Sequence, residues 1–205
     1  MRKFLEIGGV VAAVVLIAFG IATIVMGMNA RSTVRDSLKQ EQIVGSPDMT
    51  PDAIAAEAKT AGLPANIVLP TKAVADEPIT TGDEARTFAS YMRIHTLLAT
   101  GGQTYSQMGQ YLDANGNQTS DPAKAAKDPK TGKPVPNQAR DVWVTYTALS
   151  TALNTSYFAE TVGVFGIVMG IALLLVGIGF LVLVLGGIER KPTTAATPTP
   201  TAAKS

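Results

Sequence analysis

Two long runs of apolar residues without a charge constrain this chain more than any other feature. The first covers residues 7–28 and the second covers residues 162–188. A helix needs about 20 apolar residues to cross the ~30 Å hydrocarbon core of a bilayer, and both runs are long enough. The sequence therefore predicts two transmembrane helices, with residues 29–161 between them on one side of the membrane.

The first run could also belong to a secretory signal peptide, because Arg2 and Lys3 form a basic segment ahead of it. Its apolar part is about 22 residues long, however, whereas a signal peptide has about 7–15. The exit Met28-Asn29-Ala30 is also a poor match to a small-x-small cleavage site. We therefore expect an uncleaved signal anchor, with residues 1–6 in the cytoplasm.

The charges around the second run indicate the orientation. Arg190 and Lys191 follow this run, whereas Glu160 precedes it. Cytoplasmic flanks carry the excess of Lys and Arg, so we expect both termini in the cytoplasm and residues 29–161 outside the cell membrane. Three basic residues just beyond the first run argue for the opposite orientation, namely Arg31, Arg35 and Lys39. They carry less weight, because segments longer than about 60 residues are translocated largely regardless of their charge.

Small residues recur at seven-residue spacing in both runs, which places each set on one narrow stripe of a helix. Helices in lipid associate where small residues let their backbones approach, so the two stripes predict contact between the two spans. Gly166 and Gly170 also form a G-x-x-x-G motif, which could instead pack two copies of the chain as a homodimer. Small residues are also common in membrane helices in general. One antiparallel register pairs Gly27 with Gly163, Gly20 with Gly170 and Ala13 with Gly177.

The segment between the runs has the signals of a helical bundle. Thr50 followed by Pro51 is typical of a helix start, and Thr81 with Glu84 forms a capping box. Residues 113–136 are rich in turn dipeptides and are expected to form a mobile loop. The expected helices cover about residues 31–43, 51–61, 82–100 and 104–112, and a last one runs from about 138 into the second span.

These patterns predict one fold class. It is an all-α membrane protein with two antiparallel transmembrane helices and an extracytoplasmic helical bundle between them. Residues 189–205 are rich in Thr, Ala and Pro, so we expect a disordered cytoplasmic tail.

The composition excludes several kinds of site. The chain has no cysteine and one histidine, His95, so disulfides, thiolate metal sites and zinc sites with two imidazoles are excluded. We predict no catalytic residue, no cofactor and no metal. The net charge of +1 gives no reason to expect nucleic acid as a partner.

Oxygen-bearing side chains alternate in the loop at positions 1, 3, 5, 7 and 9 of a calcium-type pattern. Gln118 stands where the pattern needs glycine, and Lys124 stands where it needs glutamate. We therefore prefer a polar turn to a calcium site. The residues of this weak candidate are Asp113, Asn115, Asn117, Thr119 and Asp121.

Aromatic residues and the histidine are the remaining candidates for binding. His95 shares its expected helix with Tyr91, and Trp143 lies well before the second span. The candidate ligand or partner contacts are Tyr91, His95, Tyr105 and Trp143.

The run YMRIHTLLATGGQTYSQMGQYLD, the loop DPAKAAKDPKTGKPV and the two spans resemble a family of small actinobacterial membrane proteins. The resemblance covers nearly the whole chain outside the tail. Some members carry the label of aromatic ring-opening dioxygenases. That chemistry uses non-haem iron on two histidines and a carboxylate, and His95 is the only histidine here. The resemblance therefore implies a location and an architecture, not an activity.

The function expected from the sequence is a non-enzymatic one. The domain outside the membrane would bind or scaffold a protein partner in the membrane or envelope, with the lipid bilayer itself as the second partner. The alternative is an extracytoplasmic sensor that binds a ligand and signals through a separate cytoplasmic partner.

Overall fold

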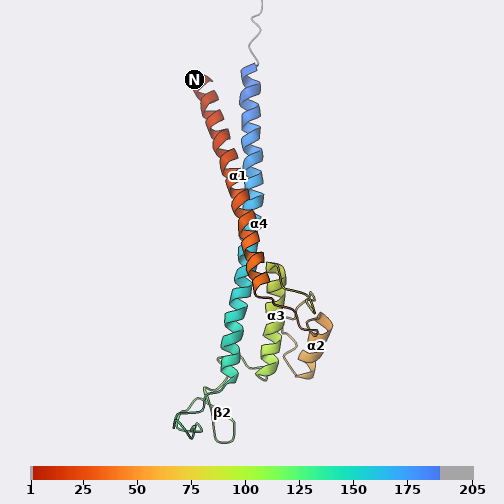
Figure 1. Cartoon of the computed structure of the whole chain (residues 1–205), viewed down its shortest axis with the longest axis vertical. Coiled ribbons are helices and arrows are strands. Elements are labelled where there is room, and N and C mark those ends of the chain that lie inside the picture. The colour runs from red at the N-terminus through yellow and green to blue at the C-terminus, as the bar shows by residue number, and fades with distance from the viewer. Residues whose placement is uncertain (1, 190–205) are drawn as a thin grey trace, which may run out of the picture. The chain divides into compact units, whose positions relative to one another are not determined.

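A computed structural model describes residues 2–189 of the chain. Its helices are α1 (Arg2–Gln40), α2 (Pro51–Thr60), α3 (Gly82–Ala99) and α4 (Ala139–Glu189), as Figure 1 shows. Two short strands, β1 (Tyr111–Leu112) and β2 (Gln118–Thr119), pair antiparallel between α3 and α4. The prediction of a mostly helical chain with two long apolar helices is confirmed. The predicted tail lies, from residue 190 onwards, outside the described residues.

The chain divides into two compact units. Among the described residues, the first, here called the apolar unit, combines residues 2–26 with 166–189, and the second, the helical unit, is residues 27–165. Helices α1 and α4 each contribute residues to both units. The helical unit also contains α2, α3 and the strand pair.

Close approach of two backbones defines the apolar unit. A Cβ atom added at Gly170 would lie 2.7 Å from the carbonyl oxygen of Gly20, and one at Gly177 would lie 3.0 Å from that of Ala13. Any larger side chain at Gly20 or Gly170 would collide with backbone atoms of the other helix. In the helical unit, a Cβ at Gly163 would lie 3.0 Å from the carbonyl oxygen of Gly27.

The rest of each apolar run is exposed. Within residues 4–28 and 162–186, the buried positions are those of the small-residue stripes, while Gly166 is half-buried. Phe19 and Leu175, for example, are 64% and 62% exposed. Both long helices are apolar enough to cross a membrane, and only 11% of each apolar window is buried. A helix in the core of a soluble protein would be mostly buried.

The core of the helical unit lies where α2 and α3 meet the ends of α1 and α4. Ile54 of α2 and Tyr91 and Ile94 of α3 are fully buried. Leu38 of α1 and Leu153 of α4 complete the same cluster. Apolar side chains at helical spacing thus hold four helices around one core.

The two predicted helix starts are confirmed. The side chain of Thr50 accepts a hydrogen bond from the N–H of Ala53, and Pro51 is the first residue of α2. At α3, Thr81 accepts from the N–H of Glu84, and the Glu84 carboxylate accepts in turn from the N–H of Thr81. Both caps satisfy N–H groups that a helix start leaves without partners.

The predicted helix over residues 104–112 is wrong. These residues form turns that lead into strand β1. Gly109 has no side chain, and a Cβ there would lie 2.6 Å from the backbone nitrogen of Thr119. The Gly109 N–H also donates to the side chain of Gln118. Pairing with β2 therefore replaces the local helix that the apolar spacing suggested.

Two other expectations differ in detail. Helix α1 ends at Gln40 rather than near residue 43, because Gln42 adopts a positive φ of 51° that a helix does not allow. The loop over residues 113–136 makes backbone hydrogen bonds to strand β1. The N–H of Leu112 donates to Val135, and the N–H of Ala126 donates to Leu112.

The close approach in the apolar unit predicts the effect of one methyl group. Gly170→Ala would place its Cβ against Gly20, whereas nothing lies within 4 Å of a Cβ at Gly179 on the same helix. We expect Gly170→Ala to destabilise the protein by about 1–3 kcal/mol, the usual range for overpacking. Thermal unfolding in detergent would measure this, with Gly179→Ala as the matched control. Equal melting temperatures for the two variants would contradict the contact.

Candidate functional site

The most apolar cavity described in the helical unit is a groove of about 540 Å³ between α1, α3 and α4. Leu38 comes from α1, Phe88 and Met92 come from α3, and Leu149 and Leu153 come from α4. We call this cavity the apolar groove. Its remaining lining residues are Ser37, Glu41, Ile43, Ala152 and Ser156.

The apolar groove has the features of a binding site rather than a reaction site. Its volume falls within the roughly 300–1,000 Å³ typical of ligand pockets. The lining is largely hydrophobic, and Glu41 is the one ionisable group among the residues that line it. Such a surface can hold an apolar molecule or segment, and it offers no pair of groups for acid–base chemistry.

A buried carboxylate lies at the start of α3. The Glu160 side chain of α4 is only 11% exposed. One of its oxygens lies 2.8 Å from Nη2 of Arg35 and 3.4 Å from Nε of Arg31, both on α1. The other oxygen accepts a hydrogen bond from the backbone N–H of Gly82 at 2.7 Å. Glu160 therefore joins α1, α3 and α4.

The pKa of Glu160 reflects two opposing effects. Burial raises the pKa, because a charged carboxylate loses hydration. The hydrogen bond from Gly82 and the guanidinium groups of Arg35 and Arg31 lower it more. The net result is a pKa below the ordinary value of 4.5, so the carboxylate is ionised at neutral pH.

The contact at Gly82 requires a residue without a side chain. A Cβ at this position would lie 2.7 Å from the Cα of Tyr157 and 3.2 Å from the Glu160 carboxylate. One turn further along α3, the Arg86 guanidinium lies 4.5 Å from the centre of the Tyr157 ring. The first turn of α3 is thus held against α4 by charge and by close packing.

Two of the predicted contact residues, Tyr91 and Tyr105, lie in different surroundings. Tyr91 is fully buried, and its hydroxyl donates to the carbonyl of Lys72 at 2.8 Å. Burial raises the pKa of Tyr91 above its ordinary value. Tyr105 is 45% exposed, and the Arg140 guanidinium lies 3.8 Å from its ring centre. Tyr105 and Trp143 line one open hollow on α4, and Tyr91 and His95 are not part of its lining.

Trp143 is a core residue, with 6% of its surface exposed. Its indole N–H donates to the carbonyl of Gln103 at 2.7 Å and lies 3.3 Å from the Thr100 hydroxyl. The Tyr146 ring packs edge-on against the indole, with 5.3 Å between the ring centres. The indole therefore ties the segment after α3 to the start of α4.

The weak calcium candidate forms turns in the structure. One carboxylate oxygen of Asp113 accepts hydrogen bonds from the N–H groups of Asn115 and Asn117, and this lowers the pKa of Asp113. Thr119 accepts from the N–H of Asp121. These oxygens accept hydrogen bonds from the local backbone.

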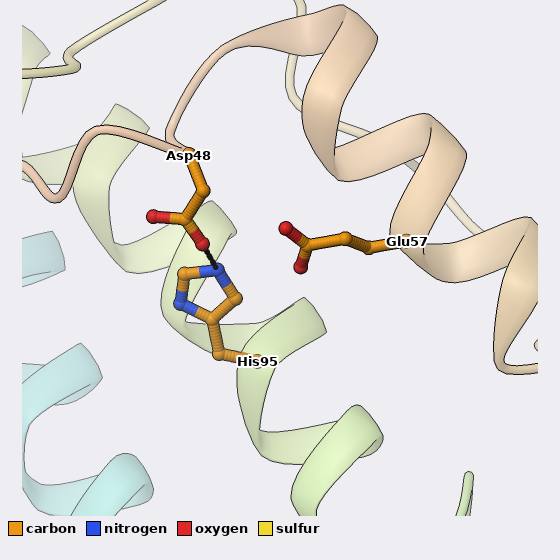
Figure 2. A group of neighbouring side chains, drawn as sticks. All are labelled: Asp48, Glu57 and His95. Atoms are coloured by element: carbon orange, nitrogen blue, oxygen red, sulfur yellow. Dashed lines mark ion pairs between the residues drawn. The ribbon is translucent and has the colours of Figure 1, made fainter.

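The structure brings His95 to two carboxylates that the sequence did not connect with it. Asp48 lies in the turn before α2, Glu57 lies on α2, and His95 lies on α3, as Figure 2 shows. One ligand atom of each lies within 4.8 Å of those of the other two. The hydrogen bond from Ser46 and the charge of His95 hold the pKa of Asp48 below its ordinary value, although burial opposes them.

The sequence offered no signal for this cluster or for the buried carboxylate. Asp48 and His95 are 47 positions apart, and no metal-binding motif uses that spacing. In the sequence, Glu160 is only a negative charge ahead of the second apolar run. Both groups of residues become neighbours through packing of the helices.

Comparison with protein-family models, with curated proteins and with solved structures found no match to this chain. The resemblance to the actinobacterial membrane proteins therefore stays a prediction.

The Glu160 contacts predict the effect of removing one charge. Glu160→Gln keeps the shape of the side chain but leaves Arg31 and Arg35 without their anionic partner. We expect a loss of roughly 1–3 kcal/mol in the free energy of unfolding, measured by denaturation in detergent. The control is Asp83→Asn, which removes the exposed ion pair with Lys72 and should cost about 1 kcal/mol or less.

The stabilisation by Glu160 should also decrease as the pH falls. Because the folded pKa of Glu160 is depressed, its contribution is present above about pH 4.5 and is lost as the pH falls through the folded pKa. The difference in stability between wild type and Glu160→Gln should therefore shrink on acidification below pH 4.5. A difference that does not change with pH would argue against the ionised carboxylate.

Proposed function

We propose that this chain is an integral membrane protein that crosses the bilayer twice. Residues 7–28 and 162–188 carry no charge, and at 1.5 Å per residue they form about 33 Å and 40 Å of helix. Within residues 7–28 and 162–186, most of the large apolar side chains are exposed. Soluble monomers rarely expose apolar patches of more than a few hundred Å², and a bilayer would cover this surface.

The packing in the apolar unit supports the same proposal. Gly20 and Gly170 contact through backbone atoms, with no polar side chain between them. In lipid, where apolar side chains gain nothing by leaving the solvent, close packing of small residues is the main source of helix association. The proposed topology has antiparallel spans, both termini in the cytoplasm and residues 29–161 outside it.

The proposed role of residues 29–161 is to bind or scaffold a partner in the membrane or envelope. The observation that carries this proposal is the apolar groove between α1, α3 and α4. Two of the predicted aromatic contacts, Tyr91 and Trp143, are instead buried and hydrogen-bonded within the unit. An apolar helix or extended segment of a partner protein would fill the groove as in other helix-in-groove complexes.

The second candidate is a sensor that binds a small apolar molecule in the same groove. The volume of about 540 Å³ favours it, because it suits a drug-sized ligand. Signalling would then pass through a separate cytoplasmic partner. We propose no enzymatic activity, because ring-opening chemistry on non-haem iron would need a second histidine.

The topology can be tested with single cysteines, since the chain has none of its own. Asn115→Cys lies in the exposed turn between β1 and β2, and Ala203→Cys lies in the tail. A membrane-impermeant maleimide should label Asn115→Cys in intact spheroplasts and Ala203→Cys only after lysis. Labelling of both before lysis, or of Ala203→Cys alone, would overturn the proposed orientation.

The groove can be tested with a photo-crosslinking amino acid in native membranes. Leu149 lies in the groove, and Thr155 is exposed on another face of the same helix. A probe at Leu149 should give one discrete protein adduct that a probe at Thr155 does not give. Leu153→Glu, which places a charge in the groove, should abolish the adduct. An adduct of small mass at Leu149 alone would favour the sensor, and equal labelling at both positions would count against both candidates.

A further inference from the structure

The side chains of Asp48, Glu57 and His95 are held on a well-packed part of the helical unit. Asp48 lies directly before Met49, which is 5% exposed and accepts a backbone hydrogen bond from Val74. Glu57 lies on α2, which is anchored by the buried Ile54 and Ala58. His95 follows the buried Ile94 on α3. The backbones that carry the three groups are therefore fixed by the core.

The histidine nitrogen at the centre of the cluster lacks a hydrogen bond. Nε2 of His95 is buried and has no hydrogen-bond partner among the described residues. Asp48 Oδ2 lies only 2.8 Å away, which is close enough for an ion pair, but the contact lacks hydrogen-bond geometry. A buried nitrogen normally makes a hydrogen bond, and the contact with Asp48 does not supply one to Nε2.

The second carboxylate also faces the His95 ring. Figure 2 shows the Glu57 side chain reaching from α2 towards the His95 ring, with Asp48 on the neighbouring side. The Glu57 carboxylate makes no hydrogen bond or ion pair within residues 2–189. Its carboxylate can therefore move without breaking another contact. With a neutral imidazole the cluster carries two negative charges, which a divalent cation would balance.

We infer that Asp48, Glu57 and His95 form a binding site for a divalent transition-metal ion of the zinc class. One imidazole nitrogen and two carboxylates suit Zn²⁺, whereas Ca²⁺ and Mg²⁺ prefer oxygen ligands alone. Zinc binds nitrogen and oxygen at about 2.0–2.2 Å, so its ligands lie about 3.4 Å apart in a tetrahedral site. The ligand atoms now lie within 4.8 Å of one another, with His95 Nε2 and Asp48 Oδ2 2.8 Å apart. Binding of the ion would therefore widen the contact between His95 and Asp48 and draw the Glu57 carboxylate closer.

The bound ion would have a defined structural effect. It links the turn before α2 to α3 through side chains, in addition to the apolar contacts between the two helices. Three protein ligands leave a fourth position of a tetrahedral ion for water or for an outside ligand. The inference does not depend on the membrane topology, since all three residues lie within the helical unit.

The test is zinc binding by the full-length protein in detergent, purified through a tag without histidine and freed of metal with a chelator. Isothermal titration with ZnCl₂ should show one ion per chain. Asp48→Asn, Glu57→Gln and His95→Gln should each weaken binding by about tenfold or more, a loss that even second-sphere partners of a metal can cause. CaCl₂ should not compete. The melting temperature of the wild type should rise with Zn²⁺, because the ion binds only the folded state.

Two controls distinguish zinc binding at the cluster from nonspecific binding to other carboxylates and from the effects of misfolding. Asp52→Asn removes one carboxylate from the first turn of the same helix, outside the cluster, and should leave zinc binding unchanged. Glu57→Gln changes a half-buried side chain without other contacts, so its melting temperature without zinc should equal that of the wild type. Absence of zinc binding would overturn the inference and leave only the contact between Asp48 and His95. Binding that survives the cluster variants, or that calcium matches, would also overturn the inference.

Discussion

The carboxylate of Glu160 has to be neutralised where it lies, and the helices around it are arranged to do so. One oxygen faces Arg31 and Arg35 on α1, and the other accepts the first N–H of α3 at Gly82. An ionised group this far from water is costly unless charges and hydrogen bonds surround it. The requirement brings three helices to one point, and only a glycine at position 82 allows α3 to come close enough.

Much of the helical unit follows from that junction. With the first turn of α3 held against α4, Phe88 and Met92 line the apolar groove together with residues of α1 and α4. His95, three positions beyond Met92, meets Asp48 and Glu57 instead. Helix α3 therefore contributes to both proposed sites. Glu160 also lies two positions before the charge-free run over residues 162–188, so this network of charges stands next to the proposed edge of the bilayer.

Features that depend on neighbouring residues could be predicted from the sequence. The caps at Thr50 and Thr81 act over three positions of the chain, and both are present in the structure. The two long apolar helices follow from composition alone. The expected helix over residues 104–112 failed because a distant segment decides its conformation: β1 pairs with β2, and Gly109 packs against Thr119. Local apolar spacing carries no information about such a partner.

The sequence by itself determined the helical class, the two charge-free runs and the small positions along each, because these are properties of single helices. Only the tertiary structure decided that Trp143 lies in the core, that three helices enclose a groove and that His95 meets Asp48 and Glu57. The physical reason is the range of the interactions. A helix and its caps depend on residues within about one turn, whereas a groove or a ligand cluster depends on how whole helices pack.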